Sequence, residues 1–140
     1  MLFRSRTLPR EFAPELSEIK DAAPYRLMPQ LMATGEDDFE RVAGYFPGDV
    51  PSVELNCGCP SPTCTGKGAG SSLLRHADEF HAMTHELTRR LGAGRLAVKM
   101  RLGYDSANEF PPLIKGLATD RKSTRLNSSH TDISRMPSSA

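Results

Sequence analysis

Short apolar runs alternate along the chain with segments whose apolar residues recur at helical spacing. Residues 52–55 and 95–103 are apolar, partly β-branched runs with glycine at or soon after their ends. Apolar runs bounded by turn residues predict strands. Residues 25–31 form a third such run, which we interpret as a strand despite Pro29. The chain therefore predicts three strands separated by helical segments.

The segment between the second and third runs has the clearest helical pattern. Gly92 follows its last periodic residue and predicts the C-terminal end of a helix. The buried face predicted by the i, i+3, i+4 spacing consists of Phe80, Met83, Thr84, Leu87 and Leu91.

Two weaker patterns predict further helices. One lies between the first two strands, and Thr34 with Asp37 three residues later predicts its start. Its apolar positions are Phe39, Val42, Ala43 and Phe46. The other covers residues 108–117 and is weakened by Pro111 and Pro112, because proline cannot donate a helical hydrogen bond.

This order of strands and helices indicates an α/β fold with a parallel sheet. Both a doubly wound sheet and a (β/α)8 TIM barrel have such alternation, and a barrel needs about 250 residues. A chain of 140 residues has room for about three βα units. If the barrel interpretation is right, the chain is therefore a partial TIM barrel.

The two ends of the chain differ from its middle. Residues 120–140 have no hydrophobic period and look like the translation of a widely used sequencing adapter, and residues 1–5 match the end of the opposite adapter. We expect both segments to lie outside the folded domain, which then covers residues 6–119, and we expect 120–140 to be disordered. A genuine polar tail is the alternative, since its composition also suits disorder.

The net charge of the chain does not identify a binding partner. The chain has 18 Lys and Arg and 17 Asp and Glu. Without the adapter-like ends, which hold five basic and two acidic residues, 13 basic and 15 acidic residues remain. No polybasic tract predicts nucleic-acid binding from composition alone. No apolar run is long enough to cross a bilayer, and no signal peptide is recognisable, so we expect a cytoplasmic protein without a membrane partner.

Cys57, Cys59 and Cys64 are the three cysteines of the chain. An odd number so closely spaced does not fit a secreted disulfide framework, so we expect reduced thiols. Zinc is an alternative, because His81 and His85 form an i, i+4 pair further along. The C-x-C spacing argues against it, since structural zinc sites use C-x2-4-C. We therefore expect no metal and treat a small zinc-binding module as the less favoured hypothesis.

The second strand and the turn after it carry a family resemblance. Residues 53–62 read Val-Glu-Leu-Asn-Cys-Gly-Cys-Pro-Ser-Pro, and residues 66–70 read Gly-Lys-Gly-Ala-Gly. This segment resembles the signature of the tRNA-dihydrouridine synthases. The resemblance implies the second to fourth units of an N-terminal FMN-binding barrel. It also implies reduction of uridine to 5,6-dihydrouridine in tRNA, with electrons from NADPH or NADH, by a monomeric parent protein. A fragment of this size is expected to be inactive.

The resemblance also implies roles for single residues. Cys59 matches the general acid of the family's Gly-Cys-Pro turn, which protonates C5 of uracil; an ordinary thiol is protonated at neutral pH, as this role needs. Gln30, Asn56 and Lys99 match positions that face the flavin, where a cation stabilises negative charge on the reduced ring. Without the resemblance, each of these residues also has an ordinary structural explanation. Gln30 would be a turn residue, Asn56 an Asx-turn former and Lys99 a solvated cation at a strand end.

Two basic residues match positions near the RNA. Lys67 belongs to the glycine-rich loop, which lacks the spacing of a phosphate-binding P-loop and which the resemblance makes a mobile, RNA-contacting loop. Ser71 or Ser72 is expected to cap a short helix after this loop. Arg101 fits either an RNA phosphate or an internal carboxylate. A different FMN-dependent barrel oxidoreductase, acting on a small molecule, remains the other enzymatic hypothesis.

Overall fold

The structure, a computed structural model, describes residues 28–46, 50–119 and 124–128. Its centre is a sheet of four parallel strands in the order in which they occur along the chain. These strands are β1 (Gln30–Leu31), β2 (Val53–Cys57), β3 (Leu96–Met100) and β4 (Thr124–Ser128). The predicted α/β class with parallel strands is confirmed.

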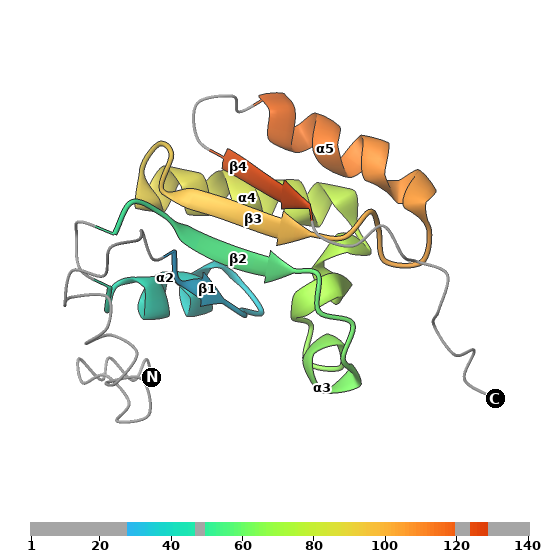
Figure 1. Ribbon diagram of the computed structural model, residues 1–140, viewed down its shortest axis with the longest axis horizontal. Coiled ribbons are helices and arrows are strands. Elements are labelled where there is room, and N and C mark those ends of the chain that lie inside the picture. Colours follow the sequence, from blue (N-terminus) through green and yellow to red (C-terminus); the bar gives the residue numbers. More distant parts are fainter. Residues whose placement is uncertain (1–27, 47–49, 120–123, 129–140) are drawn as a thin grey trace.

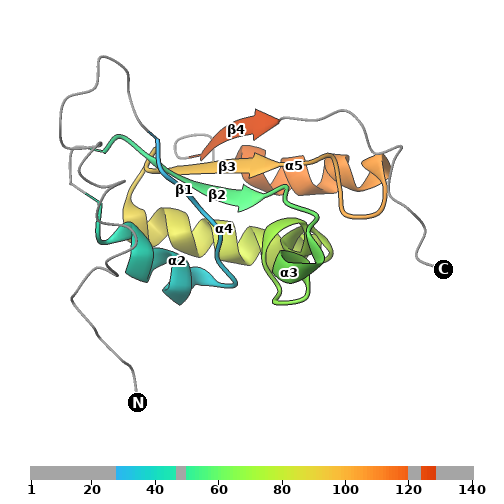
Figure 2. The same ribbon diagram turned by 60° about the horizontal axis from the view of Figure 1, so that its bottom comes forward.

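Three helices make the crossovers between these parallel strands: α2 (Glu36–Ala43), α4 (Ala77–Leu91) and α5 (Phe110–Thr119). In the two views of Figures 1 and 2, α2 and α4 lie together on one side of the sheet, and α5 continues this layer toward β4. Short helical turns precede α4 and α5. They are α3 (Pro62–Thr65), η2 (Gly70–Leu74) and η3 (Ala107–Glu109).

The helix α4 forms as its pattern predicts. Phe80, Met83, Thr84 and Leu87 are buried on one face, and Leu91 packs against the core at the end of the helix. Gly92 ends the helix with a φ of 95°, which a side chain would make strained. The predicted C-terminal stop is thus confirmed.

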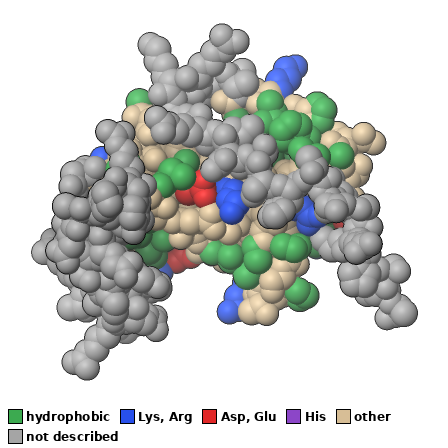
Figure 3. Space-filling view, in the orientation of Figure 1, with side chains coloured by type: hydrophobic (Ala, Val, Ile, Leu, Met, Phe, Trp, Pro, Cys, Tyr) green, Lys and Arg blue, Asp and Glu red, His purple; other side chains and the backbone are tan. Residues whose placement is uncertain are grey.

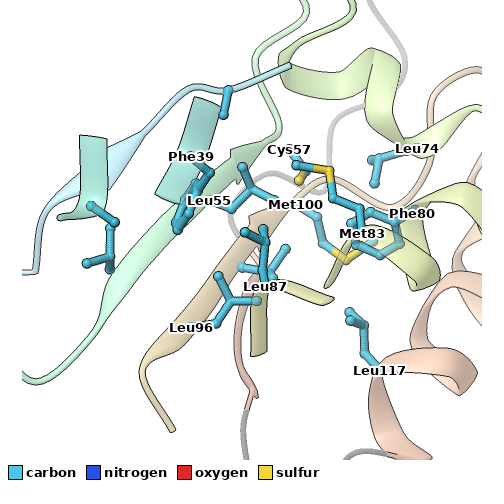
Figure 4. Close-up of a cluster of buried hydrophobic side chains, with 14 of the residues drawn as sticks. Phe39, Leu55, Cys57, Leu74, Phe80, Met83, Leu87, Leu96, Met100 and Leu117 are labelled. Atoms are coloured by element: carbon cyan, nitrogen blue, oxygen red, sulfur yellow. The ribbon is translucent and has the colours of Figure 1, made fainter. Parts of the chain in front are cut away.

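Alternation along the strands divides their side chains between two faces of the sheet. One face of β2 and β3 packs against the helices in a single apolar core, which also holds the buried residues of α2, α4 and α5. Figure 4 shows this core, whose members include Phe39, Leu55, Cys57, Phe80, Leu87, Leu96, Met100 and Leu117. The intervening residues of both strands therefore face away from the helices.

Some predicted element boundaries are wrong. Thr34 does not cap α2, because Gly35 occupies the N-cap position and no side chain bonds to the helix start there. Ser71 and Ser72 lie inside η2, which begins after Ala69. The Ser72 hydroxyl donates a hydrogen bond back to the carbonyl of Ala69 at 2.7 Å. The helix α2 thus begins at Glu36, one residue later than a Thr34 cap would place it, whereas η2 begins before both serines.

The prolines do not weaken α5 as expected. Pro111 and Pro112 are its second and third residues, where the missing N–H groups would have no partner inside the helix. The turn η3 leads into α5 and starts with a capping box in which Ser106 and Glu109 bond to each other's backbone N–H groups. This cap makes the start of the helical segment better defined than the prolines alone would suggest.

The strand β4 lies in a stretch for which the sequence predicts no regular structure. It pairs in parallel with β3 along all five residues, from Leu96 opposite Thr124 to Met100 opposite Ser128. An unpaired edge of β3 would leave backbone donors and acceptors exposed, and the segment after α5 can satisfy them. The rest of 120–140, residues 1–5 and the start of the predicted strand at 25–27 lie outside the described residues.

Candidate functional site

The face of the sheet turned away from the helices is polar. Gln30 of β1 lies opposite Glu54 of β2, and Asn56 of β2 lies opposite Lys99 of β3. Figure 3, which looks onto the molecule as Figure 1 does, shows both acidic and basic side chains near the middle of this view. The structure therefore brings three of the predicted site residues, Gln30, Asn56 and Lys99, onto adjacent strands of one face.

Gln30 and Asn56 are in direct contact. The Asn56 Nδ2 group donates a hydrogen bond to Gln30 Oε1 at 2.8 Å. The Gln30 Nε2 group in turn donates to Glu54 Oε1. These bonds form a continuous row from the buried Glu54 carboxylate across to Asn56.

Asn56 also shapes the turn that follows β2. Its Oδ1 atom accepts hydrogen bonds from the backbone N–H groups of Gly58 at 2.9 Å and Cys59 at 3.1 Å. This is the Asx-type arrangement expected from the residue alone. Because the same side chain also bonds to Gln30, the turn and the row of amides are held as one unit.

A second contact fixes the turn from the other side. The carbonyl of Cys59 accepts a hydrogen bond from the N–H of Ser71 at 2.9 Å. Gly70 has a φ of 64°, and a Cβ atom there would lie 2.5 Å from the Cys59 oxygen. Only glycine permits so close an approach, so the start of η2 and the cysteine turn are packed directly together.

The three cysteines have different surroundings. Cys57 is fully buried in the apolar core, and burial raises the pKa of its thiol far above the ordinary value. Cys59 is partly exposed, and its Sγ atom lies 3.8 Å from Sγ of Cys64. Loss of solvent contact, together with the neighbouring Cys59 thiol, also raises the pKa of Cys64.

The zinc hypothesis finds no ligand set in the part of the chain that is described. Cys57 points into the core and is thus separated from the Cys59–Cys64 pair. His81 bonds through Nε2 to the carbonyl oxygen of Leu113 at 2.9 Å. Within residues 28–46, 50–119 and 124–128, no group of three or more His, Cys, Asp or Glu side chains is placed to hold a metal ion.

The predicted RNA-facing residues come from two different loops. Lys67 is exposed in the loop between α3 and η2, on the carboxyl side of β2. Arg101 follows β3 directly and is half-buried, and its Nη1 atom is buried without a hydrogen-bond partner among the described residues. Both residues follow the carboxyl ends of strands, where parallel α/β proteins bind their ligands.

Sequence reasoning missed Glu54. Its side chain is only 4% exposed, and its Oε2 atom has no hydrogen-bond partner within the described part of the chain. The signal was an acidic residue inside the apolar run 52–55, at a position that alternates with Val53 and Leu55. Charged groups are seldom buried without a role.

The matches to known proteins decide the family. Residues 10–115 match the model of the dihydrouridine synthase family. The chain belongs to this family. All six predicted site residues of this dihydrouridine synthase family member, from Gln30 to Arg101, lie inside the matched region.

Several relatives of this family are similar to parts of the chain. A tRNA-dihydrouridine(47) synthase [NAD(P)(+)] of Coprinopsis cinerea is 41% identical over 79 residues, which cover 54% of this chain and 12% of that protein. A tRNA-dihydrouridine(16) synthase of Haemophilus influenzae is 36% identical over 58 residues, 41% of this chain and 19% of its own length.

A third relative extends the similarity. The tRNA-dihydrouridine(16) synthase of Haemophilus ducreyi is 28% identical over 103 residues, 61% of this chain and 32% of that protein. The chain thus spans about a third or less of each of these three relatives. The helices within the described residues are all too short or too polar to cross a membrane.

Proposed function

We propose that this chain is part of the flavin-binding barrel of a tRNA-dihydrouridine synthase. The strands β1, β2 and β3, which lie inside the matched residues 10–115, occur in the sheet in chain order, and β4 continues this order. Parallel crossovers are almost always right-handed, so an unchanged strand order keeps every crossover helix on the same side. A doubly wound sheet instead reverses its order and covers both faces. The strand order therefore supports a barrel segment whose polar, helix-free face would line the interior.

The residues on this face fit an FMN ring. Gln30 and Asn56 each keep one amide N–H group beyond those used in their own row. Lys99 adds an ammonium donor on the neighbouring strand. A flavin edge carries carbonyl and ring-nitrogen acceptors, so a set of three donors is chemically suited to it. FMN reduced by NADPH or NADH supplies hydride chemistry when bound.

Cys59 is the proposed general acid. It stands in a turn fixed by Asn56 on one side and by the N–H of Ser71 on the other. General acid catalysis requires a proton donor held at a defined place beside the reacting carbon. We infer that the Cys59 Sγ–H would supply the proton that C5 of a uracil ring takes up as a hydride, of the kind that bound reduced FMN supplies, adds to C6. The C5–C6 double bond is thereby saturated, and the thiolate regains a proton from solvent afterwards.

The proposed substrate is a uridine of tRNA, and Lys67 and Arg101 are the proposed phosphate contacts. Both are cations on the carboxyl side of the sheet, where the RNA would approach. Contacts of this kind contribute to affinity in a salt-dependent manner. The contact between Asn56 and Gln30 is the observation that carries the proposal most directly, since it joins the proposed flavin contacts to the cysteine turn.

A cysteine substitution in the complete protein that contains this segment tests the function. Cys59→Ala should retain FMN but lower uridine reduction at least about 100-fold, which is the usual contribution of a general acid. Cys64→Ala is the matched control, because its sulfur lies 3.8 Å from that of Cys59 but is assigned no role. Equal turnover by the Cys59 variant and the wild type would refute the proposed acid.

A further inference from the structure

The Glu54 side chain is unfavourable for folding as the structure shows it. It is buried at 4% exposure on the helix-free face, between Gln30 of β1 and Ala97 of β3 in the strand register. Only Oε1 has a hydrogen bond, from Gln30, while Oε2 has no partner among the described residues. A buried carboxylate that is only half satisfied destabilises a fold relative to an apolar residue of similar size. Stability alone therefore does not explain this residue.

The Gln30 side chain, in contrast, requires hydrogen bonds to other side chains to be held in one position. Gln30 is exposed, and a free glutamine side chain loses much rotamer entropy when it is fixed. In this structure both of its amide atoms are engaged: Oε1 accepts from Asn56, and Nε2 donates to Glu54. Glu54 is thus the second of two anchors for an otherwise mobile side chain.

The groups at the two ends of the row formed by Glu54, Gln30 and Asn56 both require the same direction of hydrogen bonding along it. At one end the backbone N–H groups of Gly58 and Cys59 can only donate, so Asn56 must offer Oδ1 to them and Nδ2 to Gln30. At the other end a carboxylate can only accept, so Gln30 must offer Nε2 to Glu54. Both amides are held in a single orientation without a competing flip.

From these contacts we propose that Glu54 is a positioning residue, which clamps the Gln30 amide so that its remaining N–H group is presented to a ligand acceptor. Through Gln30, Glu54 also supports Asn56 and thereby the turn that holds Cys59. This inference rests on the proposed function only for the identity of the ligand as FMN. The clamp itself depends on the contacts within the chain.

Two substitutions separate a positioning role from a structural one. Glu54→Met has similar length but no acceptor, whereas Glu54→Gln keeps an acceptor oxygen for Gln30. In the complete protein that contains this segment, Glu54→Met should bind FMN about tenfold more weakly, as expected for one lost oriented hydrogen bond. Its melting temperature should be no lower than that of the wild type, because a poorly satisfied buried carboxylate has been removed. Glu54→Gln should restore affinity to within about threefold.

Thr88→Val is the matched control. The Thr88 hydroxyl is another buried group without a partner in the described residues, and it lies on α4 on the other side of the sheet. Its replacement should likewise not lower stability, yet it should leave FMN affinity unchanged. If Glu54→Met lost stability while keeping full FMN affinity, Glu54 would be a structural residue and the proposal would be overturned.

A spectroscopic measurement tests the clamp without any ligand. Gln30 is the only glutamine in the 140-residue chain, so 15N-glutamine labelling gives a single side-chain amide signal pair. In the wild type, one proton of this pair should be shifted downfield and protected from exchange, whereas in Glu54→Met both should return to free values. The comparison is limited to these two proteins, because Glu54→Gln adds a second glutamine and thus a second signal pair. Free values in a wild-type chain with dispersed methyl signals would overturn the clamp.

The FMN-binding and NMR measurements together show whether the proposed function or the proposed role of Glu54 is wrong. If the complete wild-type protein does not bind FMN, the proposed function fails, while a protected Gln30 amide still supports the clamp. If FMN binds and Glu54→Met binds it as tightly as the wild type does, the clamp fails while the proposed function stands.

Discussion

Lys99 lies opposite Asn56 across β2 and β3, on the face that carries the Gln30, Glu54 and Asn56 row. It is half-buried, unlike a fully solvated surface lysine. A cation at such a place can stabilise negative charge that develops on a bound ligand. Its contribution should therefore differ from that of lysines elsewhere on the molecule.

Replacement of Lys99 tests this difference. In the complete protein, Lys99→Met should weaken FMN retention and slow flavin reduction by roughly tenfold or more, because a charge that stabilises the reduced ring is lost. Lys115→Met, at an exposed position of α5, is the control and should change neither. Flavin content and reduction rate equal to the wild type would show that Lys99 is only a strand-end charge.

The buried Cys57 thiol predicts a pattern of chemical reactivity. Its sulfur is buried, which raises its pKa and shields it from reagents, whereas Cys59 and Cys64 are partly exposed. We expect iodoacetamide to modify Cys59 and Cys64 in the folded chain and to reach Cys57 only after unfolding, as measured by mass spectrometry of digested protein. Modification of Cys57 at the rate of the other two in folded protein would contradict its place in the core.

The same shift gives a pH dependence of stability. Because the folded pKa of Cys57 lies above the unfolded value near 9.0, its contribution is fully present below pH 9.0 and is lost as the pH rises toward the folded pKa. The free energy of unfolding, measured with urea, should therefore fall more above this pH in the wild type than in Cys57→Ala. Parallel losses in both proteins would argue against a buried neutral thiol.

At the scale of elements, η2 and the cysteine turn are in close backbone contact. Gly70 and Gly68 both have positive φ, at 64° and 81°, but only a Cβ at Gly70 would meet the Cys59 carbonyl, at 2.5 Å. Backbone strain from a side chain is thus similar at both positions, while the clash is specific to Gly70.

This pair of glycines separates turn geometry from strain. Gly70→Ala should lower uridine reduction by the complete protein at least about tenfold, because the displaced turn moves Cys59 from its working position. Gly68→Ala, with nothing within 4 Å of its Cβ, should lose about 1 kcal/mol of stability but keep most of its activity. Similar activity losses in both variants would show that the close approach has no functional importance.

Elements with a strong period were predictable from the sequence. The buried face of α4, its end at Gly92 and the strands β2 and β3 follow from apolar spacing and glycine. Helix starts were less predictable: Thr34 and Ser71 have the right chemistry for caps, but the backbone begins its helical turns elsewhere. The strand β4 could not be predicted, because its pairing depends on the free edge of β3 and not on its own pattern.

The candidate site also contains residues that the sequence predicted and contacts that it did not. The resemblance pointed to Gln30, Asn56, Cys59 and Lys99, and the register of the sheet brings the strand residues among them onto one face. The hydrogen bond between Gln30 and Asn56 joins residues 26 positions apart, and no local pattern encodes such a contact. Glu54 was missed for the same reason, since its bond to Gln30 exists only when β1 and β2 are paired.

At the scale of the whole molecule, the chain should be unable to retain FMN by itself. In (β/α)8 barrels, a phosphate is frequently held by loops after the seventh and eighth strands and by a helix N-terminus. The resemblance assigns this chain to the second to fourth units. We expect equilibrium dialysis of the 140-residue chain to detect no FMN binding at micromolar concentration. A yellow preparation with stoichiometric flavin would contradict the barrel-segment proposal.

The unchanged order of the four strands also has a consequence for how the chain acquires its structure. Each strand pairs only with strands directly before and after it in the sequence, so every new βα unit docks onto one already made. Pairing of strands that are neighbours in the sequence closes shorter loops than pairing of distant strands would, and the entropy cost of loop closure grows with loop length. A ribosome-bound nascent chain could therefore complete each unit as it emerges, with the growing sheet edge as the template for the next strand.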